Sequence, residues 1–179
     1  IGAGPIGLVA GMVAQAYGGH AILLDLVQER LDFAKSLGIE YVINSGKEDA
    51  AGRIAEITGG QMAQQVMECS GANAAIRGSL DYVSNAGRIT FTGWPKKETS
   101  IPTDVITKKE IDIRGARTSA GEFEEALELI YTKRVDMNKI LTKVVSIEEA
   151  PETIVDIEKN PGDYMKVVVR IGDDPNPER

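Results

Sequence analysis

Three glycines near the start of the chain have the spacing of a phosphate-binding turn. Gly2, Gly4 and Gly7 form the pattern G-x-G-x-x-G within the stretch IGAGPIGLVAGMVAQAYGG. In such turns one glycine permits a tight bend, one lets the backbone approach a pyrophosphate, and one lets the helix pack closely on a strand. Pro5 suits the first helical turn, where an N–H is not needed, and the helix start attracts anions. The pattern alone is equally typical of an ordinary turn.

An acidic residue stands at a suitable distance behind this turn. Asp25 ends the apolar stretch HAILLD and follows Gly7 by 18 residues. In dinucleotide-binding units an acid about 20 residues beyond the glycines accepts the ribose hydroxyl groups. A carboxylate there repels a 2′-phosphate, and Leu26 and Val27 follow it instead of a basic pair. The sequence therefore predicts NAD over NADP, with a strand-end helix cap as the alternative role of Asp25.

Short β-branched runs alternate with helical patterns along the chain, as in a parallel sheet wrapped by helices. We expect strands at residues 20–25, 41–44, 64–69, 88–93 and 110–115. We expect helices at 5–17, 28–37, 73–87 and 122–131, and one opened by Ser45 and Glu48 as a capping box. The predicted fold class is α/β, a doubly wound parallel sheet (Rossmann fold) in three layers, α/β/α. The strand before the turn, IGA, is a truncated stub that leaves ladder groups of its neighbours unpaired.

Composition and charge exclude several classes of protein. The net charge of −7 and pI near 4.9 argue against a nucleic-acid partner, which selects for basic residues. No apolar run approaches the roughly 18 residues that a membrane span needs, and no signal peptide precedes the turn, so we expect a cytoplasmic protein. With one cysteine, Cys69, and one histidine, His20, the chain has no internal disulfide and too few soft ligands for zinc.

The order of the motifs resembles the cofactor-binding half of the zinc-type medium-chain alcohol and polyol dehydrogenases. The stretches that carry the resemblance are GAGPIGL, LLDLVQERLDFAKSLGIEYVIN, MECSG, NAGRITFTGW, KKEIDIRGAR and FEEALELIYTKRVDMNKILTKVVSIEEAPETI. ECSG and IRGAR are more similar to sorbitol and sugar-acid dehydrogenases than to liver-type alcohol dehydrogenases. The resemblance implies an NAD-binding domain over residues 1–143, a segment at 144–171 that returns toward a missing catalytic domain, and a tail at 172–179.

The resemblance also implies a set of cofactor contacts and no catalytic or metal-binding residue in this chain. The pyrophosphate and ribose would be held by Gly2, Gly4, Pro5, Ile6, Gly7, Asp25 and Arg30. Cys69, Ser70, Gly71, Thr92, Gly93, Ala116 and Arg117 follow later strands, at the edge where such sheets bind ligands. From the residues alone, Arg30 is equally well a surface charge and Arg117 a cap of the sheet edge. Cys69 is expected to be a small buried apolar residue, and His20 a surface residue at the opposite end.

For the parent protein, the resemblance implies oxidation of a secondary alcohol, polyol or sugar acid with hydride transfer to NAD, using zinc held by another domain. The isolated chain is predicted to bind NAD(H) and to be inactive. The unprotected strand at 111–115 is expected to pair in a homodimer, with a tetramer as a further option in the parent.

Two alternatives stay open: a regulatory module that senses NAD without catalysis, and a methyltransferase that binds adenosylmethionine. Short-chain dehydrogenases are excluded because no tyrosine of the chain is followed by lysine at the fourth position. A 2-hydroxy-acid dehydrogenase is disfavoured because His20 lies at the wrong end of the sheet.

Overall fold

The computed structural model describes residues 1–160 and 162–172, and the chain divides into two compact units. The first unit spans Ile1–Val135 and the second begins at Asp136. Residues 173–179, which make up nearly all of the expected tail, lie outside the described residues. Each unit is considered by itself below.

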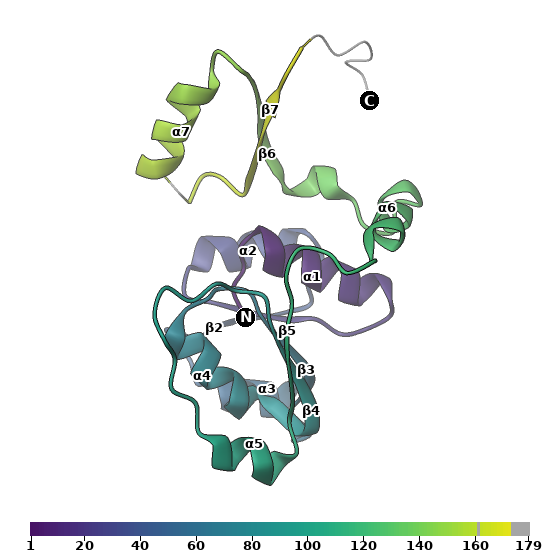
Figure 1. The fold of residues 1–179 in the computed structure, drawn as a ribbon, viewed down its shortest axis with the longest axis vertical. Coiled ribbons are helices and arrows are strands. Elements are labelled where there is room, and N and C mark those ends of the chain that lie inside the picture. The colour runs from purple at the N-terminus through teal and green to yellow at the C-terminus, as the bar shows by residue number, and fades with distance from the viewer. Residues whose placement is uncertain (161, 173–179) are drawn as a thin grey trace. The chain divides into compact units, whose positions relative to one another are not determined.

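The first half of unit 1 contains a pair of parallel strands. Helix α1 (Pro5–Ala16) leads into strand β1 (Ile22–Asp25), and α2 (Gln28–Ser36) connects β1 to β2 (Tyr41–Asn44). The strands pair in register from Ile22 opposite Tyr41 to Asp25 opposite Asn44. Helix α3 (Ala50–Ile57) then leads out of this half (Figure 1).

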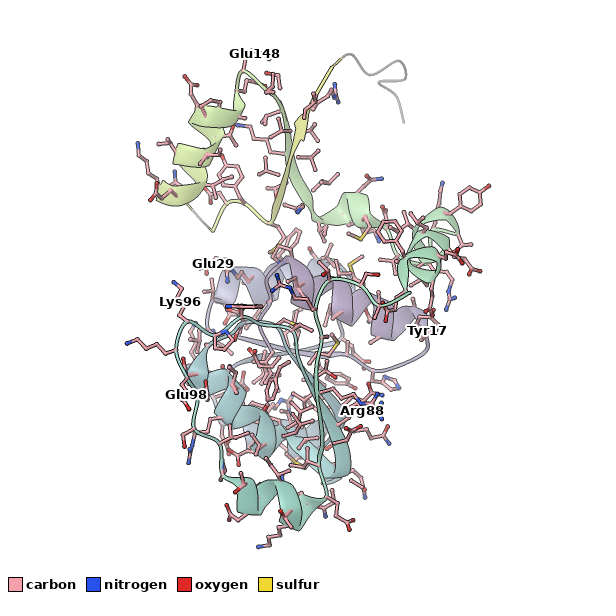
Figure 2. The ribbon with its side chains drawn as sticks, in the orientation of Figure 1. Tyr17, Glu29, Arg88, Lys96, Glu98 and Glu148 are labelled. Atoms are coloured by element: carbon pink, nitrogen blue, oxygen red, sulfur yellow. The ribbon has the colours of Figure 1, made fainter. Side chains whose placement is uncertain are left out.

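The second half contains three parallel strands in the order β3-β4-β5. Strand β3 (Ala63–Glu68) is followed by α4 (Asn73–Tyr82), β4 (Val83–Phe91), α5 (Thr103–Lys109) and β5 (Asp112–Gly115). Arg88 of β4 donates from Nε to the Asp112 carboxylate of β5 over 2.7 Å (Figure 2). Because every connection carries a helix, the strands are joined as repeated β-α-β units.

The first residues of the chain lie between the two sets of strands. Gly2 N donates to Leu24 O over 2.7 Å, and Cys69 N donates to Ile1 O over 2.9 Å. These bonds place the predicted stub between β1 and β3, at the point where strand order reverses. The prediction of a doubly wound α/β fold is confirmed. A groove of about 980 Å³ in this unit is lined by residues that include Leu23, Val66 and Met67.

Helices cover both faces of these strands. Helices α1 and α2 lie on one side, and α3 and α4, which contact each other, lie on the other (Figure 1). Two groups of buried side chains form much of the core: Leu24, Ile43, Ala50 and Ile54, and then Val66, Leu80, Val83, Ile89 and Ile111. This apolar packing fixes the carboxyl ends of the strands, where the candidate site lies.

Helix α6 (Phe123–Tyr131) is joined to the end of α1 by polar contacts. The Tyr17 hydroxyl, labelled in Figure 2, donates to the Glu125 carboxylate. The Arg134 guanidinium lies 4.8 Å from the centre of the Tyr17 ring and donates to Ala16 O. Tyr17, which follows the last residue of α1, therefore serves as the attachment point for the end of unit 1.

Unit 2 is a small parallel pair with one helix. After a 3-10 turn (Met137–Ile140), β6 (Leu141–Ser146) leads through α7 (Ala150–Lys159) to β7 (Lys166–Arg170). The second compact unit begins at Asp136, and the domain bounds expected from the sequence, after residues 143 and 171, stay predictions. The contact of residues 144–171 with a catalytic domain stays a prediction.

Three local predictions were wrong. The helix expected at 73–87 ends at Tyr82, because buried Val83 begins β4. Glu48 does not open a helix with Ser45; its carboxylate accepts from Asn44 N, and Asp49 caps α3 through Ala51 N. Helix α5 occupies a stretch where the sequence analysis placed neither a helix nor a strand.

Within residues 1–160 and 162–172, no helix has both the length and the apolar character that crossing a bilayer requires.

Candidate cofactor-binding site

The glycine turn adopts the geometry that its spacing predicts. Gly2 has φ +95°, a left-handed conformation that other residues rarely adopt. A side chain there would also meet Ser70, whose Cβ lies 3.1 Å from an ideal Cβ on Gly2. Gly7, inside α1, has no room for a side chain, since its Cβ would lie 1.8 Å from Gly2 O. The turn and the helix are therefore in direct backbone contact.

Gly4 differs from the other two glycines because the space in front of it is open. It precedes α1 with an extended backbone, and an added Cβ would meet no atom within 4 Å. Pro5 occupies the first helical position, as expected, and Ile6 exposes 57% of its surface. Open space at the positive end of a helix suits a phosphate group.

Asp25 connects the end of β1 to the glycine turn. One carboxylate oxygen, Oδ2, accepts from Ala3 N over 2.7 Å. The other, Oδ1, accepts from Leu26 N and Val27 N over 2.8 and 2.9 Å. Asp25 is not the cap of α2, because Val27 holds the N-cap position and no side chain caps this helix. Because each carboxylate oxygen can accept two hydrogen bonds, Oδ2 keeps one position for a further donor.

Arg30 points its charge toward this carboxylate. Its Nη1 lies 4.0 Å from Asp25 Oδ2, and its side chain is 37% exposed. Arg30 is therefore part of the candidate site by position and not only a surface charge.

The loops after β3 and β4 meet at the same edge of the sheet. Gly71 has φ +68°, and an added Cβ would lie 2.6 Å from Trp94 O. An added Cβ on Gly93 would lie 2.2 Å from Gly71 N. Thr92 donates from Oγ1 to Glu68 O over 2.9 Å. The structure brings these sequence-predicted residues together as one surface of closely packed backbone.

The loop after β5 reaches this surface through an aromatic contact. Ala116 N donates to Phe91 O over 2.9 Å, which continues the β4–β5 ladder by one residue. The Arg117 guanidinium lies 4.5 Å from the centre of the Trp94 ring, and Trp94 is 75% exposed. Sequence reasoning singled out Arg117 but missed Trp94 as its partner, although the motif TGW contained it.

Cys69 is half-buried, whereas the sequence predicted a buried residue. His20 is exposed, with Nδ1 3.5 Å from the Glu40 carboxylate, at the start of β1 and so at the end opposite the candidate site. In the described part of the chain, no three histidine, cysteine or acidic side chains cluster to hold a metal ion.

Sequence reasoning missed one buried acid. Glu68, the last residue of β3, has no exposed surface and accepts hydrogen bonds from the loop that follows it. The sequence feature that could have identified Glu68 is an acidic residue at the end of a predicted strand, directly before Cys69.

The sheet order, the glycine turn and the acid after β1 are those of a Rossmann-type cofactor-binding domain. A family model described as zinc-binding dehydrogenase matches residues 5–132. The chain belongs to this family and corresponds to its cofactor-binding domain.

Two relatives illustrate the similarity. A protein of Haemophilus influenzae described as an uncharacterized zinc-type alcohol dehydrogenase-like protein is 52% identical over 93% of this chain and 49% of its own length. A sorbitol dehydrogenase of Halalkalibacterium halodurans is 35% identical over 83% of this chain and 44% of its own. The chain thus spans about half the length of the relatives it matches.

Solved structures show the same fold. The alcohol dehydrogenase TADH from Thermus sp. ATN1 is 29% identical with a TM-score of 0.86, over 94% of this chain and 49% of its own. The 2R,3R-butanediol dehydrogenase from Bacillus subtilis is 25% identical with a TM-score of 0.87, over 96% and 49% of the two chains.

Proposed function

We propose that this chain binds NAD(H) as the cofactor-binding part of an alcohol or polyol dehydrogenase. One observation carries the proposal: the Asp25 carboxylate is held by Ala3 N at the start of the glycine turn, with Gly4 open beside it. A pyrophosphate at the helix start and a ribose at Asp25 would then lie on one continuous surface.

The same geometry favours NAD over NADP. The Asp25 side chain is 9% exposed and fixed by three backbone amides, so it has little freedom to move away from a 2′-phosphate. The Nη1 atom of Arg30 lies 4.0 Å from the Asp25 carboxylate and offsets only part of its negative charge. A ribose hydroxyl can donate to Asp25, whereas a phosphate at that position is repelled.

For the whole protein we propose oxidation of an alcohol or polyol, with the bound nicotinamide accepting the hydride. The similarity to a sorbitol dehydrogenase supports this substrate class. We propose that the zinc of the parent enzyme is held by another domain. We propose that this chain by itself has no dehydrogenase turnover.

Calorimetric titration of the chain with NADH and, separately, NADPH tests the proposal. We expect NADH to bind with a clear preference over NADPH. Equal affinity would contradict the role of Asp25, and no binding of either would contradict the proposed function. Trp94 is the single tryptophan of the chain and lies beside the candidate site, so its fluorescence gives an independent binding signal.

We also propose a homodimer that uses the free edge of β5. Within the described residues β5 pairs only with β4, and Ile113 in its centre is half-buried. Light scattering at high protein concentration tests this, and a monomer would count against it. The cytoplasmic location expected from the sequence is likewise a proposal, which cell fractionation tests.

A further inference from the structure

We propose that Glu68 is a positioning residue for the nicotinamide half of the cofactor. This inference rests on the proposed NAD(H) binding. Glu68 is fully buried. We assign it the role of fixing the loops that follow β3 and β4, a role that neither the glycine turn nor Asp25 fulfils.

The Glu68 carboxylate is surrounded by donors from its own loop. Oε1 accepts from Ser70 N over 2.8 Å and also from the Ser70 hydroxyl. Gly71 N lies 3.1 Å from both carboxylate oxygens. Among the described residues, no basic side chain comes within 4.0 Å of this carboxylate. Loop amides and a hydroxyl, instead of a cation, therefore hold the acid in place.

Glu68 also holds the loop of the next strand. Its backbone carbonyl accepts from Thr92 N and Gly93 N, each over 2.9 Å. An added Cβ on Gly93 would lie 2.6 Å from Glu68 Oε2, so Gly93 packs directly on the carboxylate. One residue thus binds two loops, with its side chain on one and its main chain on the other.

The loop that Glu68 fixes borders the glycine turn on its β3 side. Gly2 packs on Ser70, whose Cβ and N lie 3.1 and 3.2 Å from an ideal Cβ on Gly2. Ser70 in turn is held by Glu68 through both its amide and its hydroxyl. Ser70 therefore lies on the side of the turn that faces the second half of the sheet.

The topology decides which half of the cofactor this affects. A doubly wound sheet has two mononucleotide-binding halves, and a dinucleotide lies across the switch point between them. Asp25 belongs to the half formed by β1 and β2, which we assign to the adenosine. Glu68 ends β3 in the other half, which is left for the nicotinamide nucleotide.

The test compares Glu68→Gln with the unmodified chain for binding of NADH and of ADP, a probe that lacks the nicotinamide half. Glutamine keeps the shape of the side chain but turns an NH2 donor toward the donors of Ser70 and Gly71. We expect the NADH dissociation constant to rise about tenfold, as for one lost hydrogen bond to a charged group, and that of ADP to stay unchanged. The exposed Glu124→Gln on α6 is the matched control and should change neither.

If Glu68→Gln fails to fold by circular dichroism, Ser70→Ala carries the test, because it removes only the hydroxyl donor to Glu68. We expect about a threefold rise in the NADH constant for this variant, again without a change for ADP. Unchanged NADH binding in a folded variant, or equal losses for NADH and ADP, would overturn the assignment. Absence of NADH binding by the unmodified chain would overturn the proposed function itself, and the assignment with it.

Discussion

Ala3 N donates to Asp25 Oδ2 over 2.7 Å and thereby joins the glycine turn to the end of β1 across 22 positions of the sequence. The bond holds the carboxylate next to the start of α1 while leaving one of its acceptor positions free. Stability of the turn and recognition of the ribose thus depend on the same side chain.

Replacement of Asp25 by asparagine should therefore weaken the selection of NADH. The amide removes the charge that repels a 2′-phosphate, so we expect the preference for NADH over NADPH to fall by about tenfold in calorimetric titrations. Asp32→Asn, on the exposed face of α2, is the control and should keep the preference. An Asp25→Asn chain with undiminished preference would show that the ribose binds elsewhere.

Two alanine substitutions should separate the structural glycine from the binding glycine. At Gly7 the new Cβ would collide with Gly2 O at 1.8 Å, so we expect a loss of about 3 kcal/mol in the free energy of unfolding. At Gly4 the Cβ meets nothing, so stability should stay within about 0.5 kcal/mol while NADH binding weakens. Urea denaturation measures the stabilities and titration the binding. Normal NADH affinity in Gly4→Ala would contradict a phosphate at this position.

The sequence by itself determined the fold class, the glycine turn and the acid behind it. These features depend on local sequence. The spacing of glycines, the alternation of β-branched runs with helical patterns, and an acid at a strand end can all be read from a linear chain. The same logic failed at residues 83–87, which were expected to continue the helix but belong to β4, because Val83 is buried in the sheet core.

Only the tertiary structure decided which residues meet. Glu68 looked like one acid among many until its burial beneath Ser70, Gly71 and Gly93 showed it to be the junction of two loops. Trp94 contacts Arg117, a residue of the loop after β5. Such contacts join segments far apart in the chain, and their geometry is set by how the strands pair and twist, which local sequence does not encode.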